Sequence, residues 1–146
     1  MTRGRWLLIS GLIQAYFPTR DQKPSVFFIW GFGMSKWKLK RTAQCKKCPW
    51  RVDVNPHDIP NGYCEKKHAA LANTIAKPGD ISGVFGGNMS AMACHETHDA
   101  HCVGWLHNQL GSGNNIGLRL QAMRCENIGK IRVIGEQHEK FEDTLP

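Results

Sequence analysis

The stretch CKKCPWR, from Cys45 to Arg51, places two thiols three positions apart in a turn that a proline closes. Further along, CHETHDAHC runs from Cys94 to Cys102 and is dense in cysteine and histidine. Two thiolates separated by two residues can bind the same ion, and a tetrahedral centre then needs two more ligands from elsewhere in the chain. Together the two stretches predict a metal centre that decides how this chain folds.

The first ligand assignment takes four thiolates from these two stretches. Cys45 and Cys48 would bind the ion together with Cys94 and Cys102, which suits structural zinc and, on spacing alone, an iron–sulfur cluster equally well. Thiolates bind both metals, so the spacing does not separate zinc from iron. We expect this all-thiolate site, with Zn²⁺ as the cofactor and an iron–sulfur cluster as the alternative.

A second assignment joins Cys45 and Cys48 to Cys64 and His68 in a zinc-finger-like spacing of C-x2-C followed by C-x3-H. Cys64 and His68 are four residues apart in a predicted helix at 63–76, so both could face one ion. The simpler interpretation is that these two side chains only face the core, as part of the apolar stripe of that helix.

A third assignment builds a separate histidine site with an open coordination position, as metal-assisted hydrolysis requires. Its candidate ligands are His95, His98, His101 and His107. His95 and His98 are three positions apart, one residue short of the HExxH spacing of zinc proteases. A likeness to HNH nucleases, through His98, His101 and Asn108, is looser still because these residue types are common.

A fourth interpretation makes Cys45 and Cys48 a redox dithiol activated by Lys46 and Lys47. No βαβ pattern of the thioredoxin type surrounds the pair, which argues against it. The chain has six cysteines and no clear secretory signal. This combination is typical of a reducing compartment, so we expect a cytoplasmic protein.

The first 33 residues differ from the rest of the chain. They are rich in aromatic and aliphatic residues without helical or alternating periodicity. The run WLLISGLIQAYF at 6–17 imitates the apolar core of a signal peptide, but no cleavage site follows and the run is too short to span a membrane. We expect residues 1–33 to be an upstream extension before Met34, or a disordered or anchoring segment. Residues 34–146 are then the Cys/His-rich metal-binding domain, and no membrane partner is expected.

The positive charge of the chain is concentrated near its beginning. The net charge is +7, yet residues 1–51 hold eleven Lys and Arg against a single Asp, whereas residues 52–146 hold eight against eleven Asp and Glu. Cations at this density can contact phosphates, so they predict a nucleic-acid surface, although a solvated basic segment is the simpler interpretation. The candidate contact residues are Lys36, Lys38, Lys40, Arg41, Lys46, Lys47 and Arg51.

The predicted fold is a small α+β domain that the metal stabilises, with short helices and little sheet. Apolar residues make up 41% of the chain, enough for a modest core. Asn114 or Asn115 is the expected N-cap of the last helix, and Gly111 ends the helix before it. The expected helices cover residues 63–76, 102–110 and about 115–123, and the expected strands cover residues 51–54 and 130–134.

Three motifs in this order resemble the signature of an uncharacterised bacterial and phage domain family: CxxCPWR from Cys45, the pair Cys94-His95, and Cys102-x-Gly104. The segments GWLHNQLGSGNNIGLRL and GEQHEKFEDTLP further resemble a phage and prophage branch of that family. The resemblance covers roughly residues 38–146 and brings no established activity. It implies a mobile-element origin, makes His95 a ligand or a partner of one, and groups as ligands Cys45, Cys48, Cys94 and Cys102.

Three further residues receive structural roles. Cys64 and Cys125 fall outside the signature, so we expect them to be buried small hydrophobes. Gly104 is expected to let the helix backbone approach the metal turn closely, because it has no side chain.

The predicted function is metal binding, with structural zinc, by a small binding or regulatory module of phage or prophage type. Its partner would be an unidentified protein or a nucleic acid, in the host bacterial cytoplasm. The alternatives are an iron–sulfur redox module and a metal-dependent hydrolase or nuclease that uses the histidine-rich segment. An all-thiolate zinc site leaves no open position for a substrate, so the first ligand assignment argues against hydrolysis at that ion.

Overall fold

A computed structural model of the chain describes residues 35–60, 62–81, 84 and 89–146, and the compact unit considered below runs from Ser35 to Pro146. The predictions for residues 1–33 lie outside the described residues. The α-helices are α2 (Glu65–Ala70), α4 (Val103–Leu110) and α5 (Ile116–Ala122). The 3-10 helices are η1 (Pro56–Asp58), η2 (Leu71–Thr74), η3 (Ile128–Lys130) and η4 (Glu142–Thr144).

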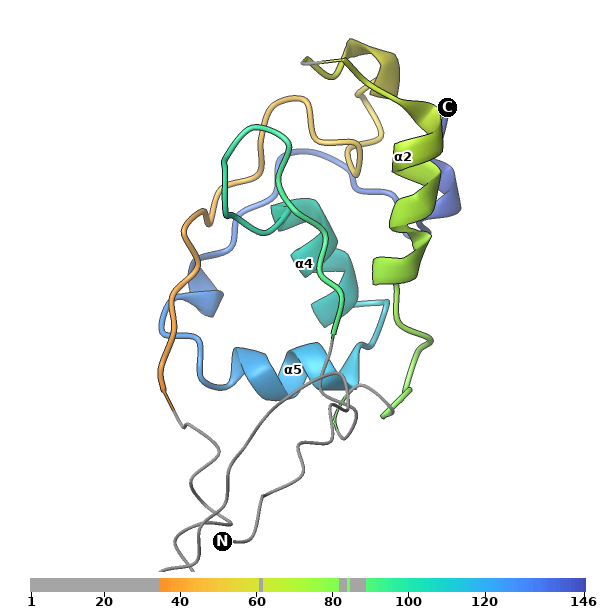
Figure 1. Cartoon of the computed structure of the whole chain (residues 1–146). Helices are drawn as coiled ribbons and strands as arrows, with labels where there is room; N and C mark the ends of the chain where they lie inside the picture. The colour runs from red at the N-terminus through yellow and green to blue at the C-terminus, as the bar shows by residue number, and fades with distance from the viewer. Residues whose placement is uncertain (1–34, 61, 82–83, 85–88) are drawn as a thin grey trace, which may run out of the picture. The chain divides into compact units, whose positions relative to one another are not determined.

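The helix α4 is the centre of the core. It starts directly after Cys102 and ends at Gly111, which confirms the prediction for 102–110. Six of its residues are buried, including Trp105 and Leu106. Figure 1 shows α4 with the other segments arranged around it, and α5 lying across its end. A helix that is buried on most of its faces explains why polar side chains of α4, such as Gln109, must find partners inside the protein.

The helix α5 begins at the predicted cap. The side chain of Asn115 accepts a hydrogen bond from the backbone N–H of Leu118 at 3.0 Å. Asn115 also donates to Gln109 of α4 at 3.3 Å. The cap therefore fixes the start of α5 and ties it to α4, as expected from an asparagine at this position.

The helix predicted at 63–76 is shorter than its pattern indicated. It forms α2 over Glu65–Ala70 and then tightens into the 3-10 helix η2. The hydroxyl of Thr74 donates to the carbonyl of Leu71 at 2.7 Å, and the N–H of Ala76 donates to Gln109 at 3.1 Å. These local and tertiary bonds replace the α-helical ones, because a threonine hydroxyl competes for the helical carbonyls.

The two predicted strands are wrong, because the described residues contain isolated bridges in place of strands. The bridges join Trp37 to Cys125, Ala43 to Arg132, Arg51 to Gln137 and Ala93 to His101. The small fold with short helices is thus confirmed, whereas its β part is reduced to these bridges.

The side chain of Asn127 explains why the neighbouring bridges do not extend into a ladder of paired strands. Asn127 binds the backbone of Leu39 on both sides, accepting from its N–H at 2.7 Å and donating to its carbonyl at 2.9 Å. An amide side chain thus occupies the place that a paired strand would take. In Figure 1 the orange segment that follows residue 35 runs beside the blue segment near η3.

Two tryptophans fill the interior of the domain. Trp50 and Trp105 are almost fully buried. Their indole N–H groups have partners, because Trp50 donates to the sulfur of Met92 at 3.4 Å and Trp105 donates to the carbonyl of Thr74 at 3.1 Å. Such large buried side chains give a small domain much of its apolar contact. Within the part of the chain that is described, no helix is both long and apolar enough to cross a membrane.

Candidate metal centre

Two thiols of one turn and a third that is distant in sequence meet inside the core. Cys45, Cys48 and Cys102 are 4%, 0% and 3% exposed. The sulfur atoms of Cys48 and Cys102 lie 3.7 Å apart, and the Cys45 thiol hydrogen-bonds to Cys48. Cys45 and Cys48 belong to a tight turn in which the N–H of Cys48 donates to the carbonyl of Cys45 at 3.3 Å. Cys102 is the residue directly before α4.

A short hairpin supplies Cys102 and carries a histidine to the same place. The N–H of Cys94 donates to the carbonyl of Ala100 at 2.7 Å, and the N–H of Cys102 donates to Met92 at 2.8 Å. Asp99, with a φ of 56°, lies in the turn between these two segments. The hairpin places the Nε2 atom of His95 at 3.8 Å from the sulfur of Cys45. The turn at Cys45 and the hairpin thus present a thiol and an imidazole to each other.

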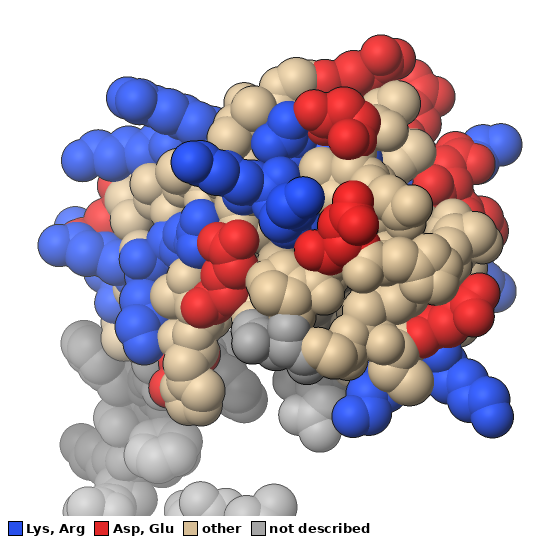
Figure 2. All heavy atoms as spheres, turned by 90° about the horizontal axis from the view of Figure 1, so that it is seen from above, with Lys and Arg blue, Asp and Glu red and all other residues tan. Residues whose placement is uncertain are grey.

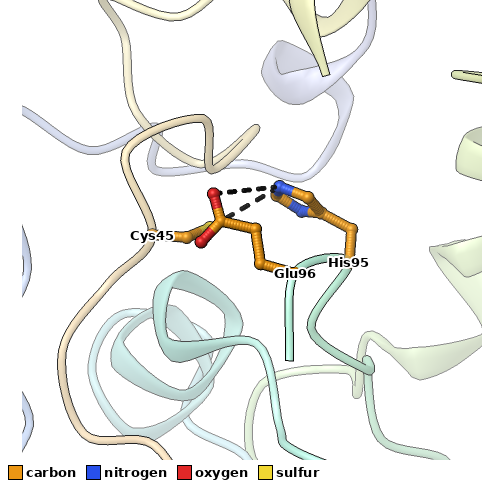
Figure 3. A group of neighbouring side chains, drawn as sticks. All are labelled: Cys45, His95 and Glu96. Atoms are coloured by element: carbon orange, nitrogen blue, oxygen red, sulfur yellow. Dashed lines mark hydrogen bonds and ion pairs between the residues drawn. The ribbon is translucent and has the colours of Figure 1, made fainter. Parts of the chain in front are cut away.

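A carboxylate completes a group that could hold a metal ion. Cys45, His95 and Glu96 bring one ligand atom each within 4.8 Å of one another, and Figure 3 shows their side chains pointing toward one another. Glu96 lies 3.9 Å from the Nε2 atom of His95 and is also paired with Arg41 at 3.1 Å. Glu96 was not among the predicted ligands, although its position next to Cys94-His95 was a signal for it.

The close fit of α4 against the turn depends on Gly104. A Cβ atom at this position would lie 2.5 Å from the Cβ of Trp50 and 2.9 Å from the sulfur of Cys48. Real Cβ atoms do not approach neighbours so closely, and the turn backbone gives little room to yield. The predicted role of Gly104 is thus confirmed: its missing side chain lets the start of α4 contact the cysteine turn.

The three thiols differ in how readily they ionise. Hydrogen bonds from the thiols of Cys102 and Cys45 lower the pKa of Cys48 to about 3, against the effect of its burial. The hydrogen bond to the Cys48 thiolate raises the pKa of both Cys45 and Cys102, and burial raises each further. One buried thiolate is therefore stabilised by two protonated neighbours. Further ionisation needs a cation, because adjacent buried anions repel one another.

The fourth predicted ligand, Cys94, lies beside this group. It is half-buried, and its charge is close enough to contribute to the raised pKa of Cys45. The dipeptide Cys94-His95 thus offers two donors near the same three thiols. The set Cys45, Cys48, Cys94 and Cys102 stays a prediction, with His95 as the competing fourth ligand.

The second pair of predicted ligands, Cys64 and His68, serves a different purpose. His68 is buried and both of its ring nitrogens have partners: Nδ1 with the hydroxyl of Tyr63 at 2.8 Å and Nε2 with the hydroxyl of Thr144 at 3.2 Å. Burial lowers the pKa of His68, which favours the neutral ring. Cys64 is exposed, so its prediction as a buried residue is wrong, whereas Cys125 is buried as predicted. Cys64 precedes α2 in extended backbone, outside the helical stripe.

The remaining histidine candidates are dispersed. The side chain of His98 is 89% exposed and pairs with Asp99 at 2.9 Å. The ring of His101 packs on Trp37, with 5.9 Å between ring centroids, and burial lowers its pKa. Asn108 donates to the carbonyl of Glu139 at 2.8 Å. Among the described residues, the group of possible metal ligands that forms includes neither His98, His101 nor His107.

Several cations of the basic segment are engaged with acids or carbonyls of the same chain. Ion pairs join Lys38 to Glu126, Arg41 to Glu96 and Arg51 to Asp53, and Lys40 donates to the carbonyl of His98. Lys36, Lys46 and Lys47 form no ion pair within the part of the chain that is described. Figure 2 shows the blue side chains of one face interrupted by red ones. This face therefore does not present a continuous cationic surface.

These features define a small domain with short helices, a buried group of three thiols, and beside it a group of one cysteine, one histidine and one glutamate that could hold a metal ion. A family model described as a family of unknown function (DUF6283) matches residues 40–144, and the chain belongs to this family. The expected membership in an uncharacterised family is thus confirmed, while the phage origin stays a prediction. Comparisons with curated proteins and with solved structures found no match.

Proposed function

We propose that the protein binds one structural zinc ion through Cys45, Cys48, Cys102 and His95, and that the ion holds together a small binding module. The separation of the Cys48 and Cys102 sulfurs is the observation that carries the proposal. Tetrahedral zinc with Zn–S distances of about 2.3 Å requires its sulfur ligands to lie about 3.8 Å apart. The observed separation is 3.7 Å.

A second distance between ligand atoms, from His95 to Cys45, also fits tetrahedral zinc. A tetrahedron with a Zn–S distance of about 2.3 Å and a Zn–N distance of about 2.0 Å places sulfur and nitrogen about 3.5 Å apart. The sulfur of Cys45 and the Nε2 atom of His95 are 3.8 Å apart. Zinc would thus enter with small adjustments of side chains, and we favour His95 over Cys94 as the fourth ligand for this reason.

The charge of the centre also favours a bound cation. Three buried thiols in contact can hold only one thiolate comfortably, as the opposite pKa shifts of Cys48 and its two neighbours indicate. A zinc ion deprotonates its thiol ligands outright and compensates their charge. Glu96, paired with Arg41, lies 3.9 Å from the same Nε2 atom of His95 that would bind the ion, so its carboxylate would add negative charge on the metal side of the histidine.

A structural role follows from the ligand count. Four protein ligands close the coordination shell, which leaves no position for a substrate or an activated water. The wide separation of His98, Asn108 and the thiols among the described residues gives no support to a hydrolase or nuclease site. An iron–sulfur cluster would require the fourth thiolate, Cys94, and is the alternative that the experiment must address.

The deciding experiment measures the metal of the full chain after anaerobic purification without a polyhistidine tag. Zinc, iron and acid-labile sulfide are quantified in the wild type, in His95→Ala and in Cys94→Ser, with His98→Ala as an exposed-histidine control. We expect about one zinc per chain, at least a tenfold loss of zinc affinity in His95→Ala and no loss in His98→Ala. If zinc is lost in Cys94→Ser alone, the fourth ligand is Cys94 and not His95. Iron with matching sulfide, or no metal, would refute the zinc proposal.

The surface charge of the module indicates the class of its partner. Lys46 and Lys47 lie within the cysteine turn, are exposed and form no ion pair in the described part of the chain, and they support contact with a phosphate-bearing partner such as nucleic acid in the bacterial cytoplasm. Retention of the zinc-loaded protein on a nucleic-acid column at about 50 mM salt, lost in the double variant Lys46→Ala and Lys47→Ala, is the expected result. No retention at this salt concentration would point to a protein partner.

A further inference from the structure

A cavity of about 330 Å³ opens beside the metal centre. Three segments form its walls: the end of the cysteine turn, the segment from Ile59 into α2, and the hairpin that carries Cys102. Its apolar lining comes from Pro49, Ile59, Pro60, Leu71, Met92 and Ala93. Cavities of this size with mostly apolar walls and a few polar groups are typical of small-molecule sites.

The charged side chains of the described lining have one sign, which is positive. Among the lining residues that the structure describes, Lys67 is the only lysine or arginine, and none is an aspartate or glutamate. Lys67 is exposed and forms no ion pair in the described part of the chain. The other titratable groups of that wall are neutral: Tyr63 and His68 hydrogen-bond to each other, and burial disfavours the charged form of each. A ligand in the cavity would therefore meet a single positive charge at the position of α2.

The cavity also reaches the proposed zinc ligands. His95 and Cys102 belong to its lining, together with the apolar Met92 and Ala93 of the same hairpin. The side of the cavity that faces the centre thus combines apolar atoms with groups that the metal would occupy. We expect the part of a ligand on this side to be apolar, because the described lining there includes Met92 and Ala93.

We propose that this cavity binds a small organic anion with an apolar body, in which the carboxylate pairs with Lys67 and the hydrocarbon part fills the space toward Met92. This inference goes beyond the zinc site and does not depend on the identity of the metal, although the cavity shares two residues with it. The carboxylate could belong to a free acid or to the C-terminus of a peptide chain, since both present the same group.

The test titrates the metal-loaded full chain with octanoate and follows the amide signals by NMR, with octan-1-ol as the uncharged counterpart. We expect octanoate to shift signals of the lining residues and to bind more tightly than the alcohol. Lys67→Gln should weaken octanoate binding about threefold, the effect of one ion pair at a solvent-open position, and leave the alcohol unaffected. Lys66→Gln is the matched control, because Lys66 is the neighbouring exposed lysine of α2 but does not line the cavity.

A second variant tests the cavity itself. Ala93→Trp places a large ring in the lining from an exposed position, so the fold and the metal content should persist while octanoate binding is lost. A tripeptide that ends in a leucine carboxylate, compared with its amide, identifies the source: tighter binding than octanoate indicates a chain terminus, and weaker binding indicates a free acid. The proposal is overturned if octanoate shifts no lining residue, if Lys66→Gln weakens binding as much as Lys67→Gln, or if Ala93→Trp binds normally. Metal content measured in the same samples keeps this result separate from the zinc proposal.

Discussion

Two regions of the domain carry ligand-type residues at zinc-finger-like spacing, and only one of them gathers those residues around a common point. In the cysteine turn, Cys45 and Cys48 are buried, Cys48 lies at hydrogen-bonding distance from Cys102, and Cys45 hydrogen-bonds to Cys48. In α2, Cys64 is exposed and His68 is held by two hydroxyl groups. The two regions thus differ in whether their donor atoms converge and remain available.

The comparison shows what a metal ligand needs besides the right element. A histidine can bind zinc only through a nitrogen with a free lone pair, and each nitrogen of His68 already has a hydroxyl partner. The thiols of the turn have other ligand-type groups among their partners, since Cys45 contacts His95 and Cys48 contacts Cys102. Both regions have ligand-type residues a few positions apart in sequence. What differs between them is the environment of the donor atoms.

The largest effect is expected from removing one thiol from each region. Cys48→Ser should lose the metal and destabilise the protein by about 4 kcal/mol or more, because structural zinc contributes directly to folding free energy. Cys64→Ser should keep the metal and change the free energy of unfolding by less than about 0.5 kcal/mol, as exposed positions usually do. Native mass spectrometry and urea unfolding measure both quantities. Equal loss of zinc in the two variants would break the comparison.

An intermediate effect is expected from the contact between α4 and the turn. Gly104→Ala places a Cβ at 2.5 Å from that of Trp50 and at 2.9 Å from the Cys48 sulfur, so we expect a destabilisation of about 2 kcal/mol and a weaker hold on zinc. Gly129→Ala is the control, because no atom lies within 4 Å of its added Cβ. Thermal unfolding of both variants, with zinc content, is the measurement. Normal stability of Gly104→Ala would show that α4 does not rest on the turn as described.

The smallest effect is expected at His68, and it depends on pH. His68→Gln should keep the zinc and lower the free energy of unfolding by about 1 kcal/mol at pH 8, through imperfect bonds to the two hydroxyls. Burial lowers the pKa of His68 in the folded state, so the unfolded chain binds the proton more readily. Wild type should therefore lose stability relative to the variant as the pH falls below about 6.5, and approach a constant difference below the folded pKa.

Urea unfolding of zinc-loaded wild type and His68→Gln between pH 8 and pH 5.5 measures this difference in the free energy of unfolding. Both proteins lose stability at low pH through the metal centre, and this common loss cancels in the difference. A difference that stays flat with pH would contradict a neutral, buried His68. A loss of zinc in His68→Gln would instead make this residue part of the centre and merge the two regions.

Local features of the fold were predictable from particular residues. Asn115 capped α5 and Gly111 ended α4, because these residues have strong positional preferences that hardly depend on the rest of the chain. Gly104 was predicted to permit a close approach, and the distance to Trp50 confirms it. The predicted strands at 51–54 and 130–134 failed because each forms a single isolated bridge, Arg51 with Gln137 and Arg132 with Ala43, and propensity does not register how far the pairing between distant segments extends.

The candidate site was predictable in its elements but not in its composition. The sequence by itself determined that Cys45 and Cys48 lie in one turn and that Cys102 starts a helix, since short-range spacing and helix signals suffice for both. Only the tertiary structure decided that His95 reaches Cys45, that Cys64 faces outward and that His68 is saturated with hydrogen bonds. The physical reason is that a metal centre requires donors from distant segments to converge, and convergence is a property of packing rather than of spacing.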